Sequence, residues 1–212
     1  MIKKKIMLVG GGGHCKACID VIEQANIYHI EGILDNINMM GATILGYKIV
    51  GDDSDIIRYI NEECFFFVTI GQIKSAENRI RIFQNLKINK AITPNIISPR
   101  AYVSKHAELG DGNIVMHGAI VNAGVKIGNN CILNTGCTIE HDAVIGNHNH
   151  ISTSATINGG SIIGDEVFIG SNATISNQIN ISKGSIIGSG SVVIKNIEEP
   201  GTYVGNPVIK IK

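Results

Sequence analysis

The sequence has no net charge and no long apolar run, and each of these absences excludes a class of function. Its 212 residues carry 18 lysines and arginines against 18 aspartates and glutamates. A balanced chain without a basic run is not expected to bind nucleic acid or an anionic membrane surface. The longest apolar runs, such as Ile6 to Val9 and Phe65 to Ile70, are far too short to span a bilayer.

Cysteine is scarce, and its five copies are an odd number. Most of them fall at positions expected in the core, which favours reduced thiols in a cytoplasmic protein. Cys15 and Cys18 form a C-x-x-C pair, but no second pair follows. We therefore interpret them as two thiols of a helix and expect no zinc or redox site there.

What the sequence does contain is an aliphatic residue at every sixth position from Ile97 to Val193, without exception. The side chain four places after each is mostly small or apolar, and glycine often follows directly, as in Ile163-Gly164. A period of six fits neither an amphipathic helix nor a hairpin strand. It predicts short strands, one hexapeptide to each side of a prism, stacked into a left-handed parallel β-helix of about five coils.

Before residue 95 the pattern changes, and segments typical of strands alternate with segments typical of helices. This alternation indicates a small parallel α/β sheet, about half of a Rossmann fold. We expect strands at 5–9, 31–34 and 65–70, and helices at 15–26 and 75–86. The predicted domains are 1–95, 96–197 and a C-terminal tail, 198–212, that folds back as a loop and short strand.

A glycine-rich turn joins the first expected strand to the first expected helix. Gly10 to Gly13 would present backbone N–H groups beside a helix N-terminus, which suits phosphate. Asp35 ends the second strand, where an acid often holds a ribose hydroxyl. Because residue 15 is cysteine, not the third glycine of the dinucleotide fingerprint, a nucleotide-linked small molecule is favoured over NAD. A tight packing turn is the alternative.

Among seven histidines, His141 is the strongest candidate for chemistry. A β-helix has aliphatic inner walls, so an imidazole in this half must point outward or lie at a corner. His141 is flanked by Glu140 and Asp142, and a neighbouring carboxylate raises imidazole basicity and fixes its tautomer, as a general base requires. A solvated corner histidine is the alternative. His150 lies half a coil away and can meet His141 only if two prisms pack side by side.

Several short motifs occur in a fixed order along the chain. They are Gly12-Gly13-His14, Leu34-Asp35-Asn36, Thr69-Ile70-Gly71, Ile139-Glu140-His141-Asp142 and Val204-Gly205-Asn206-Pro207. In this order and spacing, over essentially its whole length, the sequence resembles the sugar O-acyltransferase family. That family includes sialic acid O-acetyltransferases and the N-acetyltransferases of nucleotide-linked 4-amino sugars.

The resemblance implies a homotrimer with acetyl-CoA in the groove between adjacent β-helices. It implies that His141 is the general base, that Asp142 raises its basicity, and that the Gly159 N–H contacts the thioester oxygen. The residues that match acetyl-CoA positions are His150, Gly159, Ser171 and Ser189. The residues that match contacts with a nucleotide-linked amino sugar are Gly12, Gly13, His14, Asp35, Asn36 and Gly71.

The activity implied by the resemblance is direct acetyl transfer to the amine of a UDP- or GDP-linked 4-amino deoxysugar, for surface glycan synthesis and without a metal. O-acetylation of a sialic acid is the alternative within the family. A non-catalytic β-helix scaffold, or a metal-dependent trimer like γ-carbonic anhydrase, is a further alternative. The latter needs three converging histidines, and the spacing of His117, His141 and His150 does not match it. His117 is expected to be an ordinary surface residue.

Overall fold

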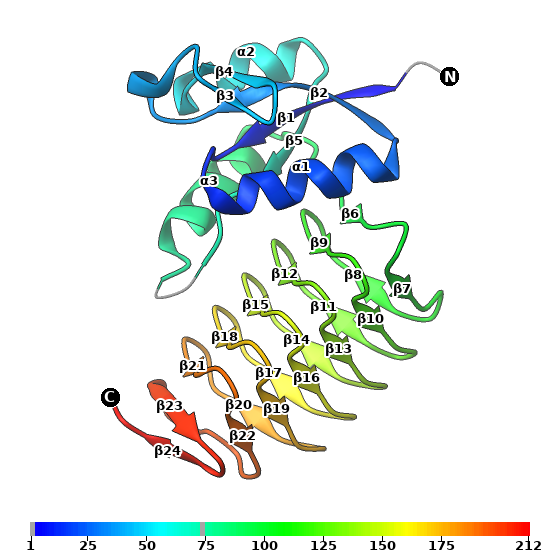
Figure 1. The fold of residues 1–212 in the computed structure, drawn as a ribbon, viewed down its shortest axis with the longest axis vertical. Helices are drawn as coiled ribbons and strands as arrows, with labels where there is room; N and C mark the ends of the chain where they lie inside the picture. The colour runs from blue at the N-terminus through cyan, green and yellow to red at the C-terminus, as the bar shows by residue number, and fades with distance from the viewer. Residues whose placement is uncertain (1–2, 73–74) are drawn as a thin grey trace.

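The computed structural model describes residues 3–72 and 75–212. In it an α/β domain stands on one side of a long triangular prism (Figure 1). The strands of the domain are β1 (Lys4–Val9), β2 (Tyr28–Leu34), β3 (Thr43–Ile44), β4 (Tyr47–Gly51) and β5 (Phe65–Val68). Its helices are α1 (Gly13–Ala25), α2 (Ile56–Asn61) and α3 (Glu77–Ile88), with short 3-10 turns at Ile37–Met39 and Asp53–Asp55.

The sheet of this domain has the order β3-β4-β2-β1-β5, with β1 parallel to β2 and β5. Along β1, Ile6 and Leu8 face the cluster that contains α1, whereas Met7 and Val9 face the cluster of α2 and α3. Burial on both faces explains why the strand is a continuous apolar run. The expected α/β fold is confirmed. The strands β3 and β4 and the helix α2 were not expected, because such short elements show little periodicity.

Three parallel sheets form the sides of the prism, and each strand pairs with the strand one coil away. The side that we call the threonine side contains β7 (Tyr102–Val103), β10 (Ile120–Val121), β13 (Thr138–Ile139), β16 (Thr156–Ile157), β19 (Thr174–Ile175) and β22 (Val192–Val193). The open side contains β8 (Glu108–Leu109), β11 (Lys126–Ile127), β14 (Val144–Ile145), β17 (Ile162–Ile163) and β20 (Asn180–Ile181). The covered side contains β6 (Ile96–Ile97), β9 (Ile114–Val115), β12 (Ile132–Leu133), β15 (His150–Ile151), β18 (Phe168–Ile169) and β21 (Ile186–Ile187).

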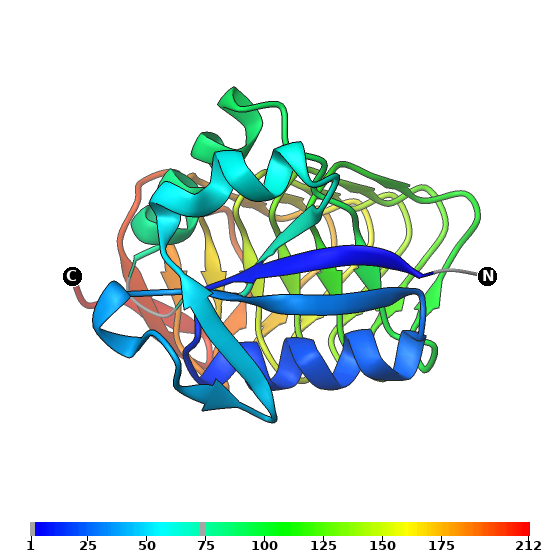
Figure 2. The same ribbon diagram turned by 90° about the horizontal axis from the view of Figure 1, so that it is seen from above.

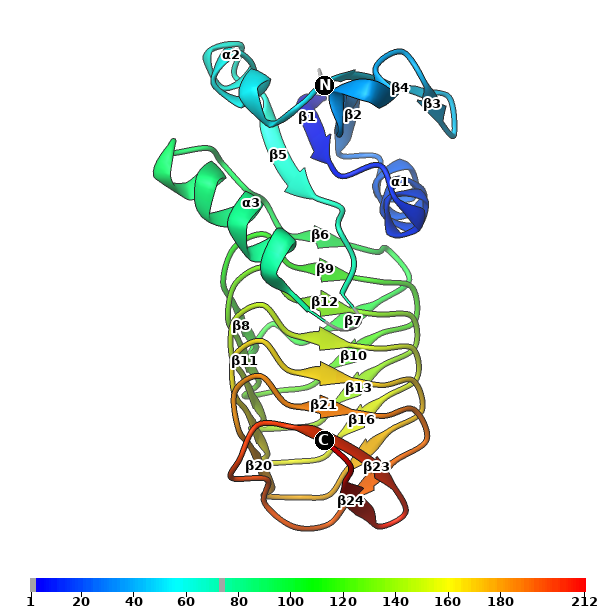
Figure 3. The same ribbon diagram turned by 90° about the vertical axis from the view of Figure 1, so that its left-hand side faces the viewer.

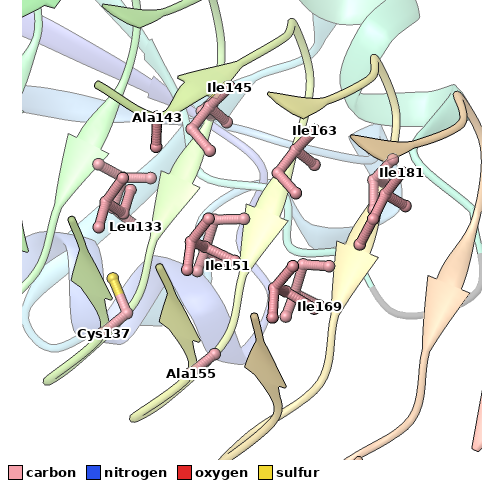
Figure 4. Close-up of a cluster of buried hydrophobic side chains, with 14 of the residues drawn as sticks. Leu133, Cys137, Ala143, Ile145, Ile151, Ala155, Ile163, Ile169 and Ile181 are labelled. Carbon is pink, nitrogen blue, oxygen red and sulfur yellow. The ribbon is translucent and has the colours of Figure 1, made fainter. Parts of the chain in front are cut away.

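The aliphatic series of the sequence fills the inside of this prism (Figure 4). Leu133, Ile151 and Ile169 stack in one row from the covered side and are completely buried. Cys137 and Ala155 pack nearby as the small residues of their repeats. Full burial of such an aliphatic side chain contributes roughly 1.5–3 kcal/mol, so the repeated pattern supplies much of the stability of this half. The predicted β-helix and its period are confirmed.

The covered side carries the N-terminal domain, with α1 on one flank and α3 on the other (Figures 2 and 3). Ile19 and Ile22 of α1 share a buried cluster with Ile114 and Ile132, which point outward from the prism. An outward isoleucine on the open side, Ile162, remains 48% exposed. The apolar outer face of the covered side is therefore the surface on which the first domain packs.

Polar contacts flank this apolar contact. Asp20 of α1 lies 2.8 Å from Nε2 of His117, whose Nδ1 lies 2.6 Å from the Ser98 hydroxyl. At the other flank, Lys87 of α3 donates to Asp111 over 2.7 Å. The expectation that His117 is an ordinary surface residue is therefore wrong, because its imidazole joins the two halves of the chain.

The C-terminal tail closes the end of the prism that is farthest from β6. β23 (Thr202–Gly205) pairs in parallel with β21, and β24 (Val208–Lys210) pairs antiparallel with β23. Tyr203 and Val208 pack against the last buried residues of the core. The tail thus forms a hairpin where a loop and one short strand were expected. No helix among residues 3–72 and 75–212 is long and apolar enough to cross a membrane.

Candidate active site

His141 and Asp142 lie together at the corner where the chain turns from the threonine side to the open side. Asp142 adopts a left-handed backbone conformation, with φ of 61°, which aspartate tolerates better than most residues. Its Oδ2 lies 2.9 Å from Nδ1 of His141. Both side chains are well exposed, at 64% and 72%. The carboxylate accepts a hydrogen bond from the protonated Nδ1, so the second ring nitrogen, Nε2, is available as a base.

Gly159 lies one coil beyond His141, and its Cα faces the imidazole. A Cβ at this position would stand 2.8 Å from both Cε1 and Nε2 of the ring, so a side chain cannot fit without displacing it. The next residue, Gly160, donates its N–H to the His141 carbonyl over 3.0 Å. Among the described residues the Gly159 N–H makes no backbone hydrogen bond. Stacking of the coils therefore places a bare backbone amide beside the His–Asp pair.

The glycine turn of the first domain is held by Asp35. The Gly11 N–H donates to Asp35 Oδ2, and the Asn36 N–H donates to Oδ1 over 2.6 Å. A Cβ at position 11 would lie 2.6 Å from that carboxylate, so glycine is required for this approach. Thr69 adds a bond from its hydroxyl to the Gly10 carbonyl. Asp35 therefore shapes the turn, in addition to standing where the sequence predicts a ligand contact.

A cavity of about 490 Å³ lies between this turn and the covered side of the prism. The residues from the predicted site that line it are Gly12, Gly13, His14, Asp35, Gly71 and His150. Asn36 lines a neighbouring cavity of about 670 Å³, which shares Gly10, Asp35 and Ile70 with the first. The structure thus brings His150, expected at the acetyl-CoA position, into the same cavity as residues expected to contact the sugar nucleotide.

A half-buried imidazole, His14, and a buried one, His150, lie together in this cavity, with ring centroids 6.5 Å apart. Burial, and secondarily the charge of Arg79, lowers the pKa of His14 to about 4. Burial also lowers the pKa of His150 to about 4, against the opposing effect of its bond to Gln72. His14 Nε2 is buried and has no hydrogen-bond partner among the described residues. A neutral imidazole with an unsatisfied nitrogen suits a ligand that supplies a hydrogen-bonding group.

Ser171 and Ser189 lie one coil apart at a different corner, where the chain turns from the covered side to the threonine side. The Ser171 hydroxyl lies 3.0 Å from that of Ser152 in the preceding coil, and its carbonyl accepts from the Gly190 N–H over 2.8 Å. Within one chain the predicted site residues therefore form three separate groups: the His141 corner, the serine corner and the interdomain cavity. His117, His141 and His150 belong to different places and do not converge on one point.

Two residues of the interdomain site were missed by the sequence analysis. Gln72 lines the cavity, and its carbonyl lies 2.8 Å from Nδ1 of His150. Arg79 is 1% exposed and donates to the side-chain oxygen of Gln72. Gln72 directly follows the Thr69-Ile70-Gly71 motif, so its position could have been suspected. Nothing in the sequence distinguishes Arg79 from the other charged residues of α3.

Comparisons with known proteins agree with this architecture. The PglD N-terminal domain family matches residues 5–86, and bacterial transferase hexapeptide repeats match 106–141 and 142–177. PerB from Caulobacter crescentus, solved with CoA and GDP-perosamine, is 28% identical, with 100% of this chain and 99% of that chain covered and a TM-score of 0.91. The acetyltransferase domain of PglB from Neisseria gonorrhoeae, solved with acetyl coenzyme A, is 28% identical, with coverages of 99% and 100% and a TM-score of 0.92.

A curated relative is also similar over part of the chain. An uncharacterized protein of Acanthamoeba polyphaga mimivirus is 37% identical over 110 residues, which are 52% of this chain and 21% of the viral protein. The chain thus spans about a fifth of the length of that relative.

An α/β domain followed by transferase hexapeptide repeats defines a class of acyltransferases. The chain carries both parts, so the resemblance to the hexapeptide-repeat sugar acyltransferases is confirmed.

The burial of His150 predicts a loss of stability in mild acid. An unfolded histidine titrates near 6.5 and the folded one at about 4, so the unfolded chain binds more protons between these values. The stability from neutral His150 is present above about pH 6.5 and is lost as the pH falls toward 4, by about 3 kcal/mol. Urea unfolding at several pH values should show that the free energy of unfolding falls less steeply with decreasing pH in His150→Gln than in the wild type. The exposed control His106→Gln should match the wild type, and an unchanged slope in His150→Gln would contradict the assignment.

Proposed function

We propose that this protein is an acetyl-CoA-dependent N-acetyltransferase that acts on a UDP- or GDP-linked 4-amino deoxysugar. The observation that carries the proposal is the bond between His141 Nδ1 and Asp142, at an exposed corner of an acyltransferase fold. PerB, which shares this fold over its full length, was solved with CoA and GDP-perosamine. A cytoplasmic location and a role in surface glycan synthesis follow from this substrate class and form part of the proposal.

The geometry supports direct transfer. His141 Nε2 takes a proton from the amine of the sugar as the nitrogen attacks the acetyl carbonyl carbon. A C–N bond forms, the C–S bond of the thioester breaks, and the leaving sulfur receives the proton that His141 took, so that CoA leaves as the thiol. In this proposal the Gly159 N–H donates to the carbonyl oxygen, where negative charge develops. Asp142 keeps the Nδ1 proton in place and stabilises the imidazolium that forms.

Cys137, the cysteine nearest in sequence to this corner, is not a suitable nucleophile for a covalent acyl-enzyme. Cys137 lies four residues before His141, but its side chain points into the prism and is completely buried. Burial raises the pKa of the Cys137 thiol to about 12, so the reactive thiolate is not formed near neutral pH. Holding both substrates against one base replaces covalent catalysis by proximity.

The two cavities at the glycine turn are the proposed site for the nucleotide-linked sugar. The turn supplies backbone N–H groups beside the first residues of α1, which suits the diphosphate. Gly12, Gly13, His14, Asp35, Asn36 and Gly71 line this region. Acetyl-CoA is assigned to the outer surface of the prism, with His150, Gly159, Ser171 and Ser189 as its contacts. Because His150 lies within the first cavity and His141 does not, we infer that the substrates meet where this cavity of one chain faces the His141 corner of a neighbouring chain.

A homotrimer is part of the proposal, because one prism leaves its catalytic corner open to solvent. The predicted cofactor residues of one chain are divided among the His141 corner, the serine corner and the interdomain cavity, so a neighbouring prism is needed to bring them together. Outward apolar residues suited to such a contact remain exposed at Ile120, Val144 and Ile162. Sedimentation at assay concentration should give a mass of about three times 22.7 kDa. A monomer with full activity would contradict a site shared between chains.

The reaction is tested with a panel of UDP- and GDP-linked 4-amino sugars and acetyl-CoA, with release of free thiol as the readout. His141→Ala should lower kcat by about two to four orders of magnitude, the usual contribution of a general base. His106→Ala, an exposed histidine at the same corner of an earlier coil, should retain wild-type turnover. Transfer only to hydroxyl groups, such as those of sialic acid, would show that the protein is an O-acetyltransferase and not an N-acetyltransferase. Normal turnover by His141→Ala would show that His141 is not the general base.

The contact between Gly159 and His141 gives a second test of the corner. In Gly159→Ala the new methyl group meets the imidazole, so the ring must move away from Asp142 or from the substrate. We expect kcat to fall about tenfold or more, since a small misplacement of a catalytic group is costly. The double variant with His141→Ala should be no slower than His141→Ala alone. Additive losses would show that Gly159 acts independently of the ring.

A further inference from the structure

Arg79 is a completely buried cation of α3, at 1% exposure. None of the ion pairs found among residues 3–72 and 75–212 involves it, and its Nε has no hydrogen-bond partner there. Burial lowers the pKa of its guanidinium to about 10, so the group stays charged near neutral pH. A buried cation without a carboxylate is unfavourable compared with an apolar side chain of similar size. Its position therefore requires an explanation beyond stability.

The guanidinium is held entirely by neutral oxygens, and these come from three separate segments. Nη1 donates to the Asn130 carbonyl, while Nη2 donates to the Gln72 side chain and, over 2.6 Å, to the His148 carbonyl. Asn130 and His148 occupy the same corner of the prism in successive coils, and Gln72 belongs to the segment after β5. Arg79 thus ties one loop of the N-terminal domain to two coils of the β-helix.

His150 is close to two of the residues that Arg79 binds, His148 and Gln72. It follows His148 by two residues, and its Nδ1 lies 2.8 Å from the Gln72 carbonyl. A carbonyl can only accept, so Nδ1 must carry the proton. The other nitrogen, Nε2, lies 3.2 Å from the side-chain amide nitrogen of Asn134 and is the acceptor of the ring. Because His150 is neutral, the choice of tautomer decides whether it offers an acceptor or a donor.

We propose that Arg79 is a positioning residue that holds the Gln72 carbonyl against His150 and so keeps this imidazole in the Nδ1-protonated tautomer. The Nε2 lone pair of His150 is then kept as an acceptor, for the Asn134 amide or, in its place, for a ligand N–H or O–H within the interdomain cavity. Arg79 itself does not line that cavity and acts only through Gln72 and the backbone at His148. The kinetic consequence rests on the proposed acetyl transfer, whereas the tautomer can be measured without any substrate.

The tautomer is read from the ring nitrogens of ¹⁵N-histidine-labelled full-length protein by NMR. Wild type should show His150 with Nδ1 protonated and Nε2 unprotonated. Arg79→Met should give shifts averaged over both tautomers. Lys87→Met is the matched control, because Lys87 also links α3 to the prism through Asp111 but is not bonded to Gln72; it should keep the wild-type spectrum. An unmixed Nδ1-protonated ring in folded Arg79→Met would overturn the proposal.

A second variant keeps the test decisive if Arg79→Met does not fold. Gln72→Met removes the side-chain acceptor of Arg79 but leaves the carbonyl that bonds His150, and it should mix the tautomers in the same way. When both variants fold, the two tautomers of His150 should be mixed no further in the double variant than in either single variant. Both changes break the same contact, between Arg79 and the Gln72 side chain. Retention of a single tautomer in Gln72→Met would show that Arg79 does not act through Gln72.

Activity gives the functional readout. At saturating nucleotide sugar, kcat/KM for acetyl-CoA should fall about tenfold in Arg79→Met, equivalent to about 1.4 kcal/mol. Lys87→Met should stay within about twofold of the wild type, which excludes a general effect of weakening the contact between the two halves. An equal loss in both variants would reduce Arg79 to a structural residue. If the wild type transfers no acetyl group, the proposed function fails, and the NMR comparison still decides the role of Arg79.

Discussion

Stacking of aliphatic side chains inside the prism is the interaction on which the rest of the structure depends. Each coil can be packed only in register with the next, because Leu133, Ile151 and Ile169 must lie directly above one another. That register fixes every corner as well as every side. Gly159 lies beside the His141 corner for this reason, and the two backbone positions cannot separate unless a whole coil shifts. The geometry of the His141 corner is therefore a consequence of how the core packs.

The second site has a different origin, since it exists only where the two halves of the chain meet. The glycine turn is shaped within the N-terminal domain by Asp35, but the far wall of its cavity includes His150 of the prism. Apolar contacts of α1 with the covered side hold the domain in place. Arg79 adds polar contacts close to the cavity, at a cost in desolvation that apolar packing would avoid. The interface thus combines a large apolar contact with a small, oriented polar one.

Much of the fold could be predicted because its signals are local and repeated. The period of six survives in the structure as strands of two residues, and the apolar run at Ile6 to Val9 is a buried central strand. The short elements between β2 and β5 were missed, since an element of two to six residues has no measurable period. His117 was misjudged because its partner, Asp20, is distant in sequence. The tail became a hairpin because Tyr203 and Val208 could cover the end of the core.

By itself the sequence determined the class of fold, the inward face of each repeat and the adjacency of His141 and Asp142, which are neighbours along the chain. Patterns of this kind report on a residue and its near neighbours, so they can be read without knowing the fold. Only the tertiary structure decided that His14 and His150 share one cavity, that Ser171 and Ser189 lie at another corner, and that Arg79 is buried. The physical reason is that these relations depend on how α1 and α3 pack on the prism, and surface complementarity leaves no periodic trace in the sequence.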